Sequence, residues 1–159
     1  MRVQIDLERL IAALPPAVFA IVADVASWPL IINSVRSIEL LTNRPIRVGT
    51  KFRETRIILG RETTFEMEVA DLEPPRRLLT ITSDRDLHYE FDHIIDAVSS
   101  GGSRLSLIFR SKPTSVAGRG LSSLMSPFME IGLRDELERD LSDLAAASAS
   151  GPDPSIAAG

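Results

Sequence analysis

The sequence predicts an α+β fold, in which a curved antiparallel sheet of about seven strands wraps round one long C-terminal helix. Two observations carry this prediction. Turn signals separate short alternating segments from about Val35 onward, and an apolar stripe with a four-residue spacing follows them. Two short helices are expected after the first strand. A sheet that curves round a helix leaves room for a cavity between them, which predicts where a ligand would bind.

The N-terminal part is predicted to hold one strand and two short helices. Residues 1–7 alternate apolar and polar side chains, which is typical of a half-buried strand. Pro15-Pro16 suits a helix start, because proline at the first helical position gives up an amide that has no partner there, and the helix is expected over 17–25. Trp28-Pro29 marks a break, after which residues 30–34 are expected to form a second helical turn.

Length, composition and charge limit the organisation and the classes of partner. With 159 residues, of which 44% are hydrophobic and 25% charged, the chain suffices for one domain, expected over residues 1–146. Residues 147–159 are rich in Ala, Ser, Gly and Pro and are predicted to form a disordered tail. The formal net charge of −4 lacks the basic field that attracts nucleic acid, so no nucleic-acid partner is expected.

Cysteine usage and the apolar segments give further expectations. The sequence has no cysteine, which excludes disulfides, thiolate metal sites and cysteine nucleophiles. The first residues lack the pattern of a secretory signal, and no apolar stretch approaches the ~20 residues that cross a bilayer. We therefore expect a cytoplasmic protein that does not insert into membranes and is a monomer or a weak homodimer.

Turn signals divide the middle of the chain into neighbouring strands joined by hairpins. The spacings leave no room for the crossover helix that parallel strands need, so an antiparallel meander is predicted. The signals stand at Asn43-Arg44-Pro45, Gly60-Arg61, Pro74-Pro75, Asp84-Arg85-Asp86 and Ser100-Gly101-Gly102.

The first of these hairpins predicts a register for two strands. A two-residue turn at Gly60-Arg61 places Arg53 opposite Glu68 on the outer face, where opposite charges attract across the pair. Side chains alternate between faces along a strand, so Glu54 and Arg56 then fall on the inner face.

Three-residue loops at 84–86 and 100–102 predict the other two registers in the same way. The first pairs Leu79 with Phe91 and Ile81 with Tyr89. The second pairs His93 with Phe109 on the inner face and Asp92 with Arg110 on the outer face. The predicted inner face comprises Phe52, Glu54, Arg56, Phe65, Met67, Val69, Leu79, Ile81, Tyr89, Phe91, His93, Ile95, Leu105, Leu107 and Phe109.

The long C-terminal helix is expected to cover this inner face, because one side of such a sheet must be buried. Pro127 lies within its apolar stripe and predicts a bend, or a new helix that Ser126 caps. The charged residues over 134–143 are interpreted as a solvated face. The stripe consists of Leu121, Met125, Met129, Leu133, Leu137 and Leu141, with Leu124, Phe128 and Leu144 beside it.

Four local strings occur in a recognisable order: Val22-Ala23-Asp24-Val25-Ala26-Ser27-Trp28-Pro29, Val48-Gly49-Thr50-Lys51-Phe52, Glu73-Pro74-Pro75-Arg76-Arg77-Leu78 and Gly101-Gly102-Ser103-Arg104-Leu105. In this order, over about residues 3–146, the chain resembles bacterial members of the SRPBCC superfamily. That superfamily shares the helix-grip fold with the birch pollen allergen, the START lipid-transfer domains and the polyketide cyclase/dehydrase proteins. The resemblance implies a hydrophobic cavity, used by lipid carriers, hormone binders and cyclases alike, and no fixed catalytic residue.

Glu54 and Arg56 form the first candidate pair for binding or catalysis. They stand two residues apart on one strand, so both can point into the cavity and pair there. The guanidinium would then hold a carboxylate or enolate oxygen of the ligand. The alternative is that this end of the strand lies at an exposed rim.

His93 is the third candidate catalytic residue, because an imidazole among aromatic side chains can act as acid, base or donor to a carbonyl. The alternative is a structural histidine satisfied by a backbone carbonyl or water. His88 is expected on the opposite face, so the two cannot share a metal, and no metal site is predicted. The sequence contains no phosphate-binding loop, and no cofactor is predicted. Tyr89 could offer its hydroxyl in the pocket, and Trp28 is expected to plug the junction between the short helices and the sheet.

The predicted function is binding or transport of a small hydrophobic molecule, such as a lipid, isoprenoid, polyketide or aromatic metabolite. One alternative is a polyketide cyclase or dehydrase, in which Arg56 steadies an enolate and His93 or Glu54 moves the proton. A further alternative is a protein-interaction module. The predicted ligand-binding residues are Phe52, Glu54, Arg56, Phe65, Met67, Ile81, Tyr89, Phe91, His93, Leu107, Phe109, Leu121, Met125, Phe128 and Met129.

Overall fold

The computed structural model describes residues 3–124 and 127–150, with side chains described outside 121–129. In this part of the chain, seven strands form one antiparallel sheet in the order β1-β7-β6-β5-β4-β3-β2. The strands are β1 (Val3–Ile11), β2 (Val35–Leu40), β3 (Lys51–Ile58), β4 (Arg61–Glu73), β5 (Arg77–Ser83), β6 (Leu87–Ala97) and β7 (Ser103–Pro113). The helices are α1 (Pro15–Val22), the 3₁₀ turn η1 (Val25–Ser27), α2 (Trp28–Ile31), α3 (Val116–Leu124) and α4 (Pro127–Ser150).

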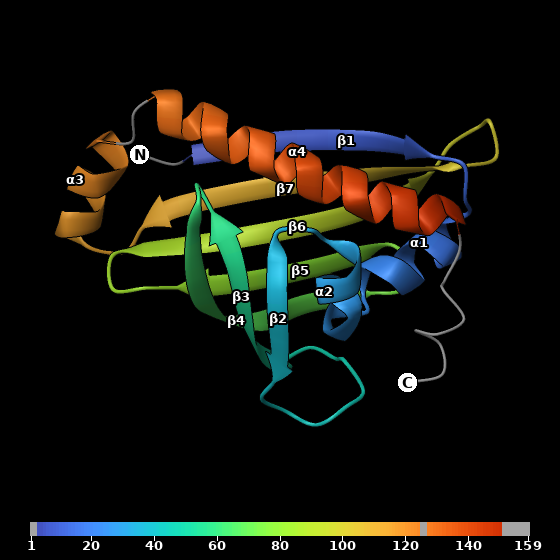
Figure 1. Cartoon of the computed structure of the whole chain (residues 1–159), viewed down its shortest axis with the longest axis horizontal. Helices are drawn as coiled ribbons and strands as arrows, with labels where there is room; N and C mark the ends of the chain where they lie inside the picture. Colours follow the sequence, from blue (N-terminus) through green and yellow to red (C-terminus); the bar gives the residue numbers. More distant parts are fainter. Residues whose placement is uncertain (1–2, 125–126, 151–159) are drawn as a thin grey trace.

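The arrangement is the helix-grip fold expected from the sequence. Helix α4 lies along one face of the curved sheet, with α1 and α2 toward its C-terminal end and α3 beside its start (Figure 1). Strand β1 extends to Ile11, beyond the predicted end at residue 7, because its ladder with β7 continues as far as the pair Ile11 and Ser103. Helix α1 starts at Pro15, where the missing amide costs nothing.

Two of the three predicted registers are wrong by two residues, and the faces are unchanged. The β3–β4 turn is formed by Leu59 and Gly60, both with positive φ (49° and 78°), so Arg53 faces Glu66 instead of Glu68. At the β6–β7 hairpin the Val98 amide donates to the Gly102 carbonyl, which moves the loop one residue earlier than predicted. Because the side-chain period is two, a shift of two residues keeps every side chain on its predicted face.

The third register, between β5 and β6, is wrong by one residue and exchanges the faces of β5. The Asp84 amide donates to the Leu87 carbonyl, so the loop holds two residues instead of three. The Asp84 carboxylate fixes this turn, because its Oδ1 accepts hydrogen bonds from the amides of Asp86 and Leu87 at 2.8 and 2.7 Å. The predicted inner pair Leu79 and Ile81 therefore faces outward. Their inner places are taken by Leu78, Thr80 and Thr82, which lie opposite His93, Phe91 and Tyr89.

Helices α3 and α4 differ in two ways from the single bent helix of the prediction. Helix α4 begins at Pro127, as the alternative of a new helix predicted, and Leu137, Leu141 and Leu144 bury its apolar stripe against the core. It continues to Ser150, through the first four residues of the predicted tail. The rest of the predicted tail, 151–159, lies outside the described residues.

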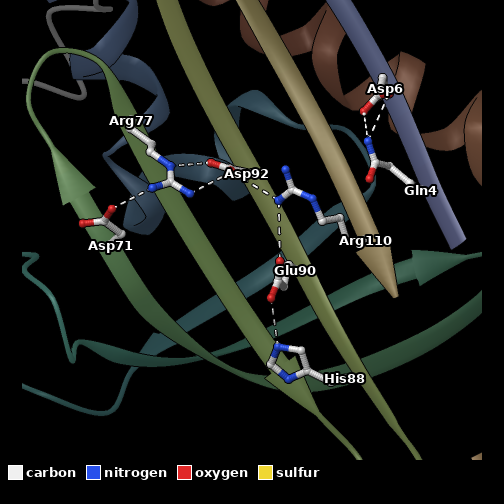
Figure 2. Close-up of polar contacts among 8 residues, drawn as sticks. All are labelled: Gln4, Asp6, Asp71, Arg77, His88, Glu90, Asp92 and Arg110. Atoms are coloured by element: carbon white, nitrogen blue, oxygen red, sulfur yellow. Dashed lines mark hydrogen bonds and ion pairs between the residues drawn. The ribbon is translucent and has the colours of Figure 1, made fainter. Parts of the chain in front are cut away.

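The face of the sheet opposite α4 carries a network of charged side chains (Figure 2). Arg77 donates from Nε and Nη2 to the two carboxylate oxygens of Asp92, both at 2.9 Å, and from Nη1 to Asp71 at 2.8 Å. Arg110 reaches Asp92 at 3.3 Å and Glu90 at 3.5 Å. Burial opposes ionisation of Asp92, but the two arginines outweigh it and hold the pKa of that carboxyl below its usual value. The network joins β4, β5, β6 and β7 across the sheet.

Candidate functional site

A cavity of about 240 Å³ lies between the inner face of the sheet and helix α4. Strands β3 to β7 supply most of its wall, α4 closes one side, and the segment around α2 closes another. Most of the wall is apolar. The lining residues are Trp28, Ile32, Glu54, Arg56, Ile58, Leu59, Phe65, Met67, Thr80, Thr82, Tyr89, Phe91, His93, Leu107, Phe109, Leu133, Glu136, Leu137, Asp140 and Leu144.

Aromatic side chains form the firm part of the wall. The Phe91 and Phe109 rings, opposite each other on β6 and β7, have centroids 5.2 Å apart. Trp28 is buried, and its indole donates to the Val22 carbonyl at 3.2 Å, which fixes the ring at the junction between the short helices and the sheet. The Trp28 ring packs edge-on against Phe52 at 6.2 Å. These contacts hold the wall in place around the cavity.

Glu54, Arg56 and Asp140 form a buried ionic cluster, which we call the inner triad. The Arg56 Nε donates to Glu54, and its Nη1 donates to Asp140 Oδ2 at 2.7 Å. The three side chains are only 6%, 11% and 7% exposed for Glu54, Arg56 and Asp140. Ser34 donates to the second Asp140 oxygen at 2.7 Å. The sheet and helix α4 are thus joined by a charged contact at the edge of the cavity.

Burial and charge act in opposite directions on Glu54 and Arg56. Burial raises the pKa of the Glu54 carboxyl above its usual value, although the Arg56 guanidinium pulls it down. Burial also acts to lower the pKa of Arg56, but Glu54 and Asp140 outweigh it and keep the guanidinium charged. One arginine therefore serves two carboxyl groups.

His93 points into the same cavity and is 5% exposed. Burial lowers the pKa of His93 to about 4; Arg56 adds to the lowering and Asp92 opposes it. The imidazole is therefore neutral at pH 7. The Leu78 backbone lies near enough to the ring to oppose the lowering of its pKa, but no group of the described residues completes a hydrogen bond of normal geometry with Nδ1, which has almost no accessible surface. The ring centroid lies 6.1 Å from that of Trp28.

Two threonines of β5 add hydroxyl groups to the cavity wall, where the predicted register had placed none. Thr82 donates to the Glu66 carbonyl at 2.8 Å, which satisfies its hydroxyl within the sheet. Thr80 is fully buried, and its Oγ1 has no partner among the described residues. The one-residue register error on β5 hid both from the prediction.

The tip of the β3–β4 hairpin meets α4 at the rim of the cavity. The Leu59 amide donates to Glu136 Oε1 at 2.6 Å, and the Leu59 side chain occupies the space that a Cβ on Gly132 would need, 2.9 Å away. Glycine at this position of the helix therefore lets the hairpin tip approach closely.

Tyr89 also borders the cavity, but its hydroxyl reaches Asp84 at 3.5 Å, and burial together with Asp84 raises its pKa to about 12.

The predicted site residues separate into three groups. Phe52 is fully buried beneath Trp28, outside the cavity wall, and Ile81 faces away, so neither lines the cavity. Met125 lies outside the described residues, and the side chains of Leu121, Phe128 and Met129 are not among those described. The others line the cavity: Glu54, Arg56, Phe65, Met67, Tyr89, Phe91, His93, Leu107 and Phe109.

Asp140 corrects the interpretation of residues 134–143 as a solvated face. It is 5% exposed and lies between the buried Leu137 and Leu141 in sequence, on the side of α4 that meets Arg56. Its place three residues after Leu137 is the signal that could have found it.

Within residues 3–124 and 127–150, no helix is both long and apolar enough to span a membrane.

Comparisons with known proteins agree with this architecture. A family model described as polyketide cyclase/dehydrase and lipid transport matches residues 2–149. No curated protein matches the chain. The Zhui aromatase/cyclase from Streptomyces sp. R1128 has a TM-score of 0.76 at 16% identity, with 93% of this chain and 94% of that chain covered.

Two further solved structures share the fold at low identity. A START superfamily protein from Mycobacterium smegmatis has a TM-score of 0.70 at 15% identity, covering 91% of this chain and 94% of that chain. Ara h 8.0201 has a TM-score of 0.72 at 13% identity, covering 95% and 100%. These likenesses confirm the helix-grip fold and the SRPBCC resemblance. Because the family match spans nearly the whole sequence, the chain belongs to the polyketide cyclase/dehydrase and lipid transport family.

Proposed function

We propose that the protein binds a small hydrophobic molecule in the cavity between the sheet and α4. The observation that carries the proposal is the largely apolar cavity itself, enclosed by aromatic and aliphatic side chains. Its volume of about 240 Å³ favours a compact ligand of one or two rings over a long acyl chain. The lipid transport named in the family description is consistent with such a role. A cytoplasmic location and a monomeric or weakly dimeric state remain predictions from the sequence.

Native mass spectrometry of the purified protein, before and after extraction with organic solvent, tests this proposal. We expect an added mass that extraction removes, or uptake of one from a mixture of fatty acids, isoprenoids and polycyclic phenols. Leu107→Trp should abolish the added mass, because Leu107 is 2% exposed and borders the cavity. Leu30→Trp is the matched control, since Leu30 is 76% exposed and does not line the cavity. A protein that stays empty under all these conditions contradicts the proposal.

A second candidate function is a cyclase or dehydrase, favoured by one observation. His93 and the inner triad of Glu54, Arg56 and Asp140 border the same cavity, so a neutral base and a cation would both be near a bound chain of carbonyl groups. Glu54→Gln and His93→Gln separate the two functions. A carrier keeps its ligand in both variants, whereas an enzyme binds a poly-carbonyl substrate but loses turnover. The protein-interaction module remains a prediction from the superfamily resemblance.

A further inference from the structure

The charged groups on the cavity wall are unequal in number. Three carboxyl groups line the cavity, those of Glu54, Glu136 and Asp140, against the single guanidinium of Arg56 among the described residues. His93 adds no positive charge at pH 7, because burial lowers its pKa to about 4. When its carboxyl groups are ionised, this wall therefore has an excess of negative charge.

The positive charge of Arg56 is already shared between two partners. Its Nε donates to Glu54, and its Nη1 donates to Asp140 Oδ2 at 2.7 Å. The side chains of Glu54 and Asp140 are only 6% and 7% exposed, so two buried carboxyl groups depend on one cation. A buried carboxylate without a full counter-charge is costly, and burial accordingly raises the pKa of Glu54 despite the presence of Arg56. A second cation beside Glu54 would remove this cost.

Glu54 has one oxygen left for a ligand. Arg56 binds its Oε1, and its Oε2 has no hydrogen bond to a described residue. The fully enclosed side-chain atoms without a partner in the described part of the chain are Thr80 Oγ1, His93 Nδ1 and Ser111 Oγ. Glu54 Oε2 is not one of them, so it keeps some accessible surface. Because Glu54 lines the cavity, this oxygen can accept a hydrogen bond from a group inside it.

The aromatic part of the wall also suits a cation. The face of an aromatic ring attracts an ammonium group within about 6 Å of its centre, and the same rings bury apolar surface. The aromatic residues of the wall come from α2 and from three strands. They are Trp28, Phe65, Tyr89, Phe91 and Phe109.

We propose that the cavity binds a hydrophobic amine in its ammonium form, with the cation at Glu54 Oε2 and the apolar part among the aromatic side chains. This inference rests on the cavity-binding function proposed above and adds the chemical class of the ligand. The ammonium group supplies the positive charge that Glu54 and Asp140 lack. A ligand carboxylate would instead add to the negative charge of the wall.

Isothermal titration calorimetry with three probes of the same ring system tests the ammonium site at pH 7. The probes are 2-naphthylmethylamine, 2-naphthylmethanol and 2-naphthoate, which carry an ammonium group, a neutral hydroxyl and a carboxylate. We expect the amine to bind about tenfold more tightly than the alcohol, the gain from one hydrogen bond between charged groups. We expect 2-naphthoate to bind more weakly than either.

Two amide substitutions assign the preference to Glu54. Glu54→Gln keeps the size of the side chain and removes its charge, so the amine should lose about tenfold in affinity while the alcohol loses nothing. Glu39→Gln is the matched control, because it removes the same charge from a side chain that is 64% exposed and does not line the cavity. It should leave all three affinities unchanged.

Two tryptophan substitutions locate the bound amine. Leu107→Trp fills the cavity and should abolish binding of the amine, whereas Leu30→Trp lies on the surface and should leave it unchanged. Equal binding of the amine by both variants would place it on the acidic surface of the protein and overturn the proposal.

The outcomes separate the ammonium site from the function on which it rests. Equal affinities for the amine and the alcohol, or an unchanged preference in Glu54→Gln, overturn the ammonium site while the cavity remains a hydrophobic site. Tightest binding of 2-naphthoate would mean that Arg56 holds the charge of the ligand, and overturns it too. No binding of any probe contradicts both the ammonium site and the cavity-binding proposal.

Discussion

The two faces of the sheet each carry an arginine held between two acidic side chains, and the two clusters behave differently. On the inner face, Arg56 contacts Glu54 and Asp140. On the outer face, Arg77 contacts Asp71 and Asp92 (Figure 2). The pKa of Glu54 is raised, whereas the pKa of Asp92 is lowered. The same residue types therefore give carboxyl groups of opposite tendency.

Depth of burial and the number of donors together explain this difference, because Glu54 is the more deeply buried carboxyl group and has fewer donors. Asp92 receives two hydrogen bonds from Arg77 and one from Arg110, and these outweigh its burial. Glu54 has only Arg56, which Asp140 shares, so burial prevails. The outer cluster connects four strands, and its arginines are paired with its carboxylates. The inner triad is paired too, but it lies beside the cavity, where binding is expected.

Removal of Arg56 should have the largest effect. Arg56→Met leaves Glu54 and Asp140 buried without a cation, and we expect the free energy of unfolding to fall by about 3–5 kcal/mol at pH 7. Urea denaturation followed by circular dichroism measures this. Arg77→Met is the matched variant on the outer face and should cost less, because the Arg77 side chain is 29% exposed and Arg110 still contacts Asp92. Equal losses would remove the distinction between the two clusters.

His93 should make the inner face sensitive to acid. Its pKa is about 4 in the folded protein, against an ordinary value of 6.5, so the unfolded chain takes up the proton first. The free energy of unfolding is therefore undiminished by His93 above pH 6.5. It falls as the pH drops toward 4, by about 3 kcal/mol for this shift in pKa. His93→Gln cannot titrate, and the loss between pH 6.5 and 4 should shrink by that amount in urea titrations. The same slope in both proteins would show that His93 is not the cause.

The contributions of Asp92 and Glu54 to the stability of the fold should change with pH in opposite directions. The lowered pKa of Asp92 stabilises the fold above its ordinary pKa of 3.8, and this contribution is lost as the pH falls through the folded value. The raised pKa of Glu54 has the reverse effect: its contribution is largest below 4.5 and is lost as the pH rises through the folded value.

Amide substitutions at these two carboxyl groups test the sign. Asp92→Asn should cost about 2 kcal/mol at pH 7, because it weakens hydrogen bonds to two charged partners, and less near pH 3. Glu54→Gln should cost less than Asp92→Asn at pH 7. A larger loss for Glu54→Gln would mean that the inner carboxyl is ionised and firmly paired.

The exposed pair of Arg53 and Glu39 should contribute least. Their side chains are 44% and 64% exposed, and the Arg53 Nη1 lies 2.7 Å from Glu39 Oε2. Surface pairs of this kind are usually worth less than 1 kcal/mol, so Arg53→Ala should change the free energy of unfolding by about 0.5 kcal/mol or less. A loss comparable to that of Arg77→Met would place this pair among the structural contacts of the sheet.

The fold was predictable because turn chemistry and the two-residue period determine strand order and faces. Glu54, Arg56, Phe65 and His93 reached the inner face even though both registers that place them were wrong by two residues. A shift of two residues along a strand does not change its face, so these errors left the candidate site intact.

The rest of the site depends on features that the sequence leaves ambiguous. The aspartates of the β5–β6 turn suit both a two-residue and a three-residue loop, and the choice decides whether Thr80 or Ile81 faces the cavity. Asp140 meets Arg56 across a separation of 84 residues. The depth at which α4 seats against the sheet determines that contact, and helical periodicity alone does not reveal it.

Trp28 gives this cavity an optical reporter of its own. It is the single tryptophan in the sequence, it borders the cavity, and its ring lies 6.1 Å from that of His93. Its fluorescence therefore comes from one place in the molecule, with no signal from a second indole to subtract. A molecule that enters the cavity changes the surroundings of this one ring. Occupancy can thus be followed by emission in the unlabelled protein.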